Sequence, residues 1–517
     1  MRSIAKFIGS IVTVILLVLL FAFYVRIKSY EDSFDVRDVS IAGSIPAQLF
    51  LPDAEKPPVV IVAHGFTADK EMMQSLAYTL VRDGFAVITF DFRGHGQNAT
   101  DFDHNRLQED MAHVVAFARN LNEDMPQSFG QGPKEVDTRR IALIGHSMGG
   151  GAVVNYGFRH PRIDATVPVA GVFGPVSETH PKNLFIIYAE NDPQDLIDAA
   201  WRMLRDGVDE ENLAADTTYG SFGLGTARRL SEVPGTDHIT ILFSMNAHEQ
   251  IRDWLRQTWD MPPNTVKPSD PRLAWMGWMY LLAFLLFFGL CSATAWYLPA
   301  IPQRTGREVV LNLVAFAVVC FVTLFVNMLA PPLSFITMPV GDNLVSYFFV
   351  AGAIFFLVAA RRGNIDFSHF KANAGRTMFA ALALFLIVYL TFGAIATEVW
   401  FRQLLTLQRL FWALLILPLL LPFFIAFEAS FKRGNTLVAL VASLIGVFIA
   451  LGMLVAGVAL GVADGFLMLI IIPMAICNVI FQLFAVYIYH LSRNYFITAI
   501  FNAFIMAWQY AVLFPLS

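Results

Sequence analysis

Cysteine is scarce in this chain of 517 residues, which contains only Cys291, Cys320 and Cys477. All three lie in apolar stretches of the second half of the chain. The more polar stretch 30–272 therefore holds no disulfide bond. This absence leaves the redox compartment open, because secreted bacterial enzymes often lack disulfides as well.

Charge is also low, since charged residues make up 15% of the chain and the net charge is −5. This balance gives no sign of a nucleic-acid partner, which would require clustered positive charge. From residue 273 onward charged residues are rare and the sequence is nearly all apolar. A soluble helical domain of that composition would lack the polar faces that meet water. We therefore predict a soluble domain over 30–272 and a membrane domain over 273–517.

Long apolar runs are abundant, and the mean hydropathy is +0.56. The run 7–25 carries no charge and can cross a bilayer as a helix, so 1–29 is predicted to be an uncleaved anchor. A cleaved signal peptide is the alternative, but the run is long for one and no Ala-x-Ala site follows. Eight further spans are predicted near residues 274–297, 309–330, 343–360, 377–397, 410–427, 437–460, 466–489 and 495–515.

Basic residues near the span ends predict the orientation in the membrane. With the N-terminus in the cytoplasm, the inner segments carry Arg2, Lys6, Arg304, Arg307, Arg361, Arg362, Lys371, Arg376, Lys432, Arg433 and Arg493. The short outer loops carry only Arg402 and Arg409. The positive-inside rule expects this bias, which predicts an extracytoplasmic location for 30–272. The prediction depends on the parity of the span count.

Short apolar runs alternate with helix-like stretches in the polar domain. Strands are predicted at 35–41, 47–51, 58–63, 85–91, 140–144, 165–170, 183–188 and 228–233, with helices between most of them, for example at 71–83 and 107–121. A hairpin followed by alternating strands and helices indicates an α/β domain with a mostly parallel sheet and helices on both faces. In such sheets the ligand site lies beyond the carboxyl ends of the strands.

Two motifs that follow predicted strands indicate nucleophilic catalysis by a serine. Gly145-His-Ser-Met-Gly149 lies between a strand and a helix start rich in small residues. A serine on so sharp a turn exposes its hydroxyl, so Ser147 is the predicted nucleophile. His64-Gly-Phe-Thr67 follows the strand at 58–63, and the backbone N–H groups of Phe66 and Met148 are predicted to form an oxyanion hole.

A serine nucleophile of this kind needs an acid and then a histidine later in the chain. Asp192 follows the strand at 183–188 and is the predicted acid, with Glu190 and Asp195 as alternatives. His238 follows the last strand and is the predicted general base.

Other histidines fit the role of base less well. His160 and His180 precede the acid in the chain, and His248 opens the last helix. His95 and His146 are predicted to have structural roles, in the turn after a strand and at the nucleophile.

Because of these residues, the stretch 35–258 resembles serine α/β-hydrolases of the esterase, dienelactone-hydrolase-like and serine-aminopeptidase-like group. The motifs that carry the resemblance are His64-Gly65, Asp91-Phe-Arg-Gly-His-Gly96, Gly145-His-Ser-Met-Gly-Gly150, Asp192 and Gly235-Thr-Asp-His238. The resemblance implies acyl transfer through a covalent seryl intermediate, usually to water, with no metal and no organic cofactor. It covers just under half of the chain.

The route to the site is expected to be open. In lidded relatives a cap domain lies between the strand at 165–170 and the strand that carries the acid, whereas here only 171–182 join them. We expect no large lid, with the loop at 209–226 as partial cover.

In the membrane domain, Glu398 and Arg402 are four residues apart, so they share one helix face and are expected to form an ion pair at a helix end. This Glu-x-x-x-Arg element, with Asn502 in the last span, is similar to that of CAAX-type intramembrane proteases. Thr397 replaces the first of that family's paired glutamates, however, and the histidines of its later spans are missing.

The leading hypothesis is a multi-pass membrane serine hydrolase that acts on an ester or amide, with a lipid-like acyl substrate and membrane lipids as partners. A transporter or channel with an accessory hydrolase domain is one alternative, although the few charged residues in the spans argue against an ion or sugar pathway. An acyltransferase to a lipid or wall polymer is another, because water and an alcohol compete for one acyl-enzyme. The sequence does not indicate the oligomeric state.

Overall fold

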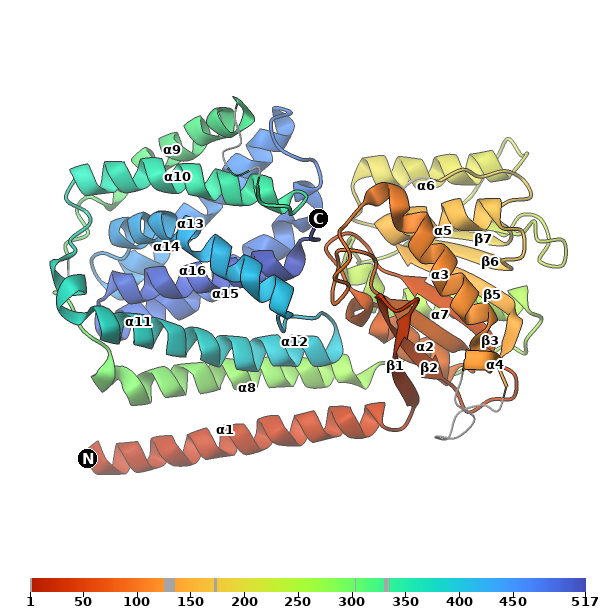
Figure 1. Cartoon of the computed structure of the whole chain (residues 1–517), viewed down its shortest axis with the longest axis horizontal. Helices are drawn as coiled ribbons and strands as arrows, with labels where there is room; N and C mark the ends of the chain where they lie inside the picture. The colour runs from red at the N-terminus through yellow and green to blue at the C-terminus, as the bar shows by residue number, and fades with distance from the viewer. Residues whose placement is uncertain (1, 125–134, 172–173, 303, 330–332, 334) are drawn as a thin grey trace. The chain divides into compact units, whose positions relative to one another are not determined.

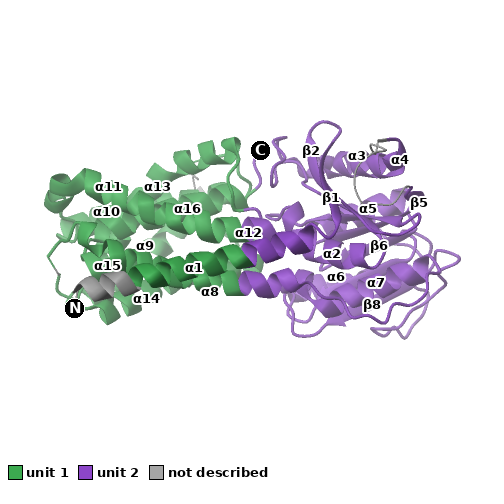
Figure 2. Cartoon of the chain, turned by 90° about the horizontal axis from the view of Figure 1, so that it is seen from below, with its two compact units in different colours: residues 1–22, 278–395, 403–514 green, residues 23–277, 396–402, 515–517 purple. Residues whose placement is uncertain are grey.

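The computed structural model describes residues 2–124, 135–171, 174–302, 304–329, 333 and 335–517. Their contacts divide the chain into two compact units, drawn in two colours in Figure 2. The first unit consists of Met1–Ala22, Trp278–Ile395 and Gln403–Phe514. The second unit consists of Phe23–Gly277, Ala396–Arg402 and Pro515–Ser517.

The second unit is built on an eight-stranded sheet in the order β1-β2-β4-β3-β5-β6-β7-β8 (Figure 1). The strands are β1 (Asp35–Ile41), β2 (Ile45–Leu51), β3 (Pro58–Ala63), β4 (Ala86–Phe90), β5 (Asp137–His146), β6 (Ala165–Val169), β7 (Leu184–Ala189) and β8 (Arg228–Val233). β2 pairs antiparallel with β1 and β4, and every other pair is parallel. The predicted α/β class with a mostly parallel sheet is therefore confirmed.

Helices cover both faces of this sheet. They are η1 (Lys70–Met73), α2 (Gln74–Arg82), η2 (His104–Arg106), α3 (Leu107–Arg119), α4 (Leu121–Asp124), α5 (Met148–Arg159), α6 (Gln194–Gly207), η3 (Thr240–Phe243) and α7 (Met245–Thr258). On β7, Ile186 packs in the cluster that includes α6, whereas Phe185 stacks on Trp254 of α7. Because side chains alternate along a strand, α6 and α7 lie on opposite faces.

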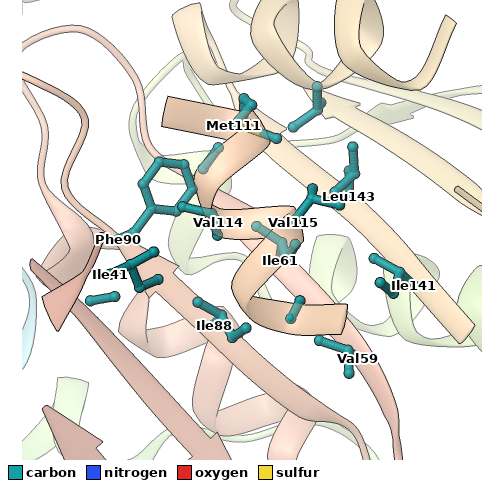
Figure 3. Packing of buried hydrophobic residues seen from close by; sticks show 14 of the residues in the cluster. Ile41, Val59, Ile61, Ile88, Phe90, Met111, Val114, Val115, Ile141 and Leu143 are labelled. Carbon is teal, nitrogen blue, oxygen red and sulfur yellow. The ribbon is translucent and has the colours of Figure 1, made fainter. Parts of the chain in front are cut away.

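The core on one face lies between α3 and the central strands (Figure 3). Val114 and Val115 of α3 belong to the same buried cluster as Ile61, Ile88 and Leu143 of the strands. Each such side chain contributes about 1.5–3 kcal/mol by leaving water. The strands are consequently a rigid base for the residues at their carboxyl ends.

The first unit is a helical bundle. Its helices are α1 (Arg2–Glu31), α8 (Pro271–Thr294), η4 (Ala295–Tyr297), α9 (Val309–Leu329), α10 (Gly341–Arg361), α11 (Ser368–Val388), the π-helical turn η5 (Tyr389–Gly393), α12 (Ala394–Val399), α13 (Leu407–Phe431), α14 (Thr436–Ala459), α15 (Leu467–Ser492) and α16 (Tyr495–Leu513), and of these α1, α8 and α12 extend into the second unit. Within the described part of the chain, nine helical segments are long and apolar enough to cross a membrane, with α11, η5 and α12 forming one of them. Nine such segments indicate a multi-pass membrane protein.

The interior of this bundle contains a buried polar network, although the sequence shows few charged residues in the predicted spans. Glu428 of α13 is fully buried, and Asn502 donates a hydrogen bond of 3.0 Å to its Oε1. Lys432 Nζ lies 3.4 Å from Glu428 Oε2 and donates to Ser443 Oγ at 2.7 Å and to Gln482 Oε1 at 2.9 Å. This network links α13 to α14, α15 and α16.

Candidate active site

Ser147 lies between the end of β5 and the start of α5, in a strained backbone conformation with φ 51° and ψ −116°. Residues with a side chain rarely adopt such angles, and they cluster at functional sites. A Cβ atom on Gly145 would lie 2.2 Å from Gly149 O, and one on Gly149 would lie 2.5 Å from His64 O. The two glycines are therefore required for this sharp turn.

The structure brings the predicted nucleophile, base and acid together. His238 Nε2 is 3.0 Å from Ser147 Oγ, and His238 Nδ1 is 2.7 Å from Asp192 Oδ1. All three residues are buried, with exposures of 6% for Ser147, 5% for His238 and 7% for Asp192. Because the carboxylate can only accept, Nδ1 carries the proton and Nε2 is free to accept the serine proton.

Hydrogen bonds between the loops after β7 and β8 hold Asp192 beside His238. The backbone and side-chain amides of Asn191 both donate to Thr236 O at 3.0 Å. Ala189 N donates to Asp192 Oδ2 at 2.8 Å, which orients the carboxylate.

The two alternative acids have other positions. Glu190 accepts a 2.7 Å hydrogen bond from Gly235 N and so belongs to the contact between the two loops. Asp195 is an exposed residue in the first turn of α6. The geometry therefore favours Asp192.

His146, beside the predicted nucleophile, contacts the loop that carries His238. Its Nε2 donates a 2.7 Å hydrogen bond to His238 O. Burial lowers the pKa of His146 to about 3, so the ring is neutral near pH 7. The sequence predicts that His146 lies at the turn of Ser147. Its hydrogen bond to His238 joins residues separated by 91 others, and no sequence motif near either residue indicates it.

The predicted oxyanion loop begins at His64. Phe92 N donates to His64 Nε2 at 3.0 Å, so His64 Nδ1 carries the proton and donates it to Gly65 O at 2.7 Å. Burial lowers the pKa of His64, which keeps this neutral form. Gly65 O and Phe66 N belong to one peptide and point in opposite directions, so His64 orients the N–H of Phe66.

That peptide lies close to the nucleophile. A Cβ atom on Gly65 would be 3.1 Å from Ser147 Cβ and 2.8 Å from His146 Nδ1. Met148, the other predicted donor, is the first residue of α5, where backbone N–H groups have no partner within the helix. Both predicted donors thus flank the serine.

The remaining histidines lie outside this arrangement. His248 contacts Thr79 Oγ1 and Leu242 O, and burial lowers its pKa to about 4. His160 Nδ1 donates to Tyr156 O. The ring of His95 packs against Phe66 with a centroid distance of 5.8 Å, which agrees with its predicted structural role.

The expectation that 209–226 partly covers the site is wrong. Gly225 O accepts a hydrogen bond from Asn183 N directly before β7, and Tyr219 pairs with Arg228 at the start of β8. The loop therefore lies at the amino ends of these strands, opposite the edge that carries Asp192 and His238. Within the described residues of 171–182, no helix forms a cap.

No group of three or more His, Cys, Asp or Glu side chains is arranged to hold a metal ion in the described ranges of the chain. The carboxylate of Asp103 caps η2 by accepting a hydrogen bond from Asn105 N.

Comparison with known proteins agrees with this fold. Residues 54–190 match a family described as serine aminopeptidase, S33. The chain is 30% identical over 117 residues to a monoacylglycerol lipase of Mycolicibacterium smegmatis, covering 22% of this chain and 37% of that protein. It is 25% identical over 179 residues to a non-heme chloroperoxidase of Kitasatospora aureofaciens, covering 34% of this chain and 56% of that protein.

Among solved structures, a predicted CIB-like hydrolase from Thermoplasma acidophilum aligns with a TM-score of 0.31 at 15% identity, covering 43% of this chain and 98% of that one. The matches to both curated relatives span less than two thirds of those proteins' length. The domain with the eight-stranded sheet has the α/β-hydrolase fold, and within it residues 54–190 match the serine aminopeptidase, S33, family.

Proposed function

We propose that this α/β-hydrolase domain is a membrane-bound serine hydrolase that cleaves acyl esters. The observation that carries the proposal is the pair of contacts from His238, at 3.0 Å to the hydroxyl of Ser147 and 2.7 Å to the carboxylate of Asp192. These are hydrogen-bond distances for a nucleophile, a base and an orienting acid.

In the proposed reaction, Ser147 Oγ attacks the ester carbonyl while His238 Nε2 takes its proton. Asp192 stabilises the imidazolium that forms. The N–H groups of Phe66 and Met148 stabilise the oxyanion, and the loss of one such donor typically costs about 10²–10³ in turnover. His238 then gives the proton to the leaving alcohol, and water attacks the acyl-enzyme by the reverse route.

A lipid ester is the substrate class that we propose. The similarity to a protein described as a monoacylglycerol lipase supports an ester of an acyl chain. The nine membrane-compatible helices support a lipid substrate, because they would hold the domain beside one. An amide substrate and acyl transfer to an alcohol use the same serine chemistry, and analysis of the products with membrane lipids added distinguishes them from ester hydrolysis.

We further propose that the hydrolase domain is extracytoplasmic. Most basic residues near the span ends lie in the segments that this orientation assigns to the cytoplasm, whereas the short outer loops carry only Arg402 and Arg409. The positive-inside rule expects this distribution.

Labelling with a fluorophosphonate probe tests the proposed nucleophile. The full chain should be labelled, and Ser147→Ala should abolish labelling and ester hydrolysis. Ser221→Ala is the matched control, because Ser221 is exposed in the loop at the opposite edge of the sheet. Labelling that persists in Ser147→Ala would overturn the proposal.

A further inference from the structure

Residues 396–402 are the last four residues of one membrane-compatible segment and the start of the connection to the next, but their contacts assign them to the same compact unit as the hydrolase domain (Figure 2). The expected ion pair between Glu398 and Arg402 is replaced by contacts with other residues. Glu398 pairs with Lys28, and Arg402 lies beside Glu71. Each charge of the segment therefore has a separate partner.

Arg402 contacts the hydrolase domain in two ways. Its backbone N donates a 2.7 Å hydrogen bond to Asp69 Oδ2. Its guanidinium Nη1 is 3.6 Å from Glu71 Oε1. Asp69 and Glu71 are only 2% and 4% exposed, so both acceptors of these interactions are shielded from water, while the Arg402 side chain is 24% exposed.

Asp69 is the last residue of the oxyanion loop, which we define as residues 65–69. Its Oδ1 accepts from Met72 N at 3.0 Å and caps η1. Within the loop, Ala68 N donates to Gly65 O at 3.3 Å. Thr67 has φ 59°, which is unfavourable for a β-branched residue. The loop is strained and must be held at both ends.

The two ends are held by different parts of the chain. His64 holds the first end through Gly65 O, and Arg402 holds the last through Asp69. The peptide between them supplies the N–H of Phe66. Asp69 is only three residues from Phe66, so a shift of Asp69 is expected to move the N–H of Phe66.

The same segment also contacts the loop of the general base. The ring of Trp400 meets Phe243 edge to face, with a centroid distance of 6.1 Å. Phe243 ends η3, which follows His238 by two residues. Residues 396–402 thus contact both loops that supply the proposed chemistry.

We propose that Arg402 is a positioning residue for the acyl-transfer site and holds the oxyanion loop through Asp69 and Glu71. This inference rests on the proposed function. The segment between two predicted spans would then affect turnover directly. If the N–H of Phe66 moves from the oxyanion position, it stabilises the transition state less, while binding of the ground-state substrate is unchanged.

The test uses full-length variants in detergent with p-nitrophenyl butyrate as substrate. Arg402→Gln removes the charge beside Glu71, and Asp69→Asn replaces an acceptor with a donor opposite Arg402 N. Each variant should lower kcat about tenfold with little change in KM, less than the loss of a whole oxyanion donor. Arg402→Lys should restore most of the kcat that Arg402→Gln loses.

Glu398→Gln is the matched control, since it removes the other ion pair of the same segment and should leave kcat unchanged. Wild-type kcat in Arg402→Gln, or an equal loss in Glu398→Gln, would overturn the inference. Arg402→Gln keeps the backbone hydrogen bond to Asp69, so it tests the positioning role of the Arg402 side chain even if Asp69→Asn does not fold. Ser147→Ala, measured in parallel, tests the proposed function separately.

Discussion

At the residue scale, the peptide between Gly65 and Phe66 illustrates how buried polar groups are used in this site. Gly65 O accepts hydrogen bonds from His64 Nδ1 and from Ala68 N. A carbonyl with two acceptor positions filled has no freedom to turn toward the nucleophile. The opposite N–H, of Phe66, is therefore oriented before any substrate binds, as the proposed stabilisation of an oxyanion requires.

Removing the His64 ring should slow turnover more than it weakens substrate binding. His64→Ala frees Gly65 O on one side, and we expect kcat to fall about tenfold to a hundredfold with KM nearly unchanged. Steady-state hydrolysis of p-nitrophenyl butyrate measures both constants. His160→Ala, at the end of α5, is the control. A kcat equal to wild type in His64→Ala would contradict the orienting role.

The buried imidazole of His146 makes stability depend on pH. Burial lowers its pKa from 6.5 to about 3, so between these values the unfolded chain binds a proton that the folded chain does not. The contribution to stability is complete above pH 6.5 and is lost as the pH falls toward 3, at about 1.4 kcal/mol per pH unit.

His146→Gln should therefore make the acid loss of stability less steep. Thermal unfolding of the full chain, followed by tryptophan fluorescence between pH 4 and 7, measures this dependence. The control is His113→Gln, because His113 is exposed on α3, and it should follow the wild-type curve. Parallel curves for His146→Gln and wild type would show that His146 does not cause the acid sensitivity.

At the element scale, the predicted strands 35–41, 58–63 and 228–233 coincide with β1, β3 and β8. Turn residues lie next to these strands, such as Gly43 after the first and Gly235 after the last, which limits where a strand can begin or end. The residues that meet at the site were also predictable, because parallel strands place their carboxyl ends at one edge. Ser147 and His238 each follow such an end.

The positions of other parts could not be read from composition. The sequence predicts the loop at 209–226 as partial cover of the site, yet this loop connects α6 to β8. A helix-to-strand connection in a parallel sheet lies at the amino edge, so topology and not composition determines its place. The bond from Arg402 to Asp69 joins residues 333 positions apart, and neither residue carries a local signal of the other.

The buried pair of Glu428 and Lys432 should stabilise the bundle only as a pair. Lys432→Met leaves the carboxylate without its counter-charge and should cost about 3–5 kcal/mol. Glu428→Gln combined with Lys432→Met removes both charges and should recover most of that loss. Thermal unfolding in detergent measures the difference, with Lys371→Met, at an exposed position, as control. A double variant no more stable than Lys432→Met would contradict the pairing.

At the scale of the whole molecule, the chain segments that make up the second unit test the predicted number of membrane spans. Its three parts are Phe23–Gly277, Ala396–Arg402 and Pro515–Ser517. Among the membrane-compatible segments of the described chain, the first two parts begin in the last turns of the first and fifth segments, and the third part begins just after the ninth. If every segment crosses the membrane, odd-numbered segments all end on the same side. The grouping by contacts therefore agrees with a count of nine, on which the proposed orientation depends.

The orientation itself can be tested with single cysteines in a Cys477→Ser background, which removes the one exposed cysteine of the chain while Cys291 and Cys320 stay buried. Ser221→Cys, in the hydrolase domain, should react with a membrane-impermeant maleimide in intact cells. Lys371→Cys, in a segment predicted to be cytoplasmic, should react only after permeabilisation, because the reagent cannot cross the bilayer. The opposite pattern would place the hydrolase domain in the cytoplasm, and the basic residues would then gather on the outer side, against the positive-inside rule.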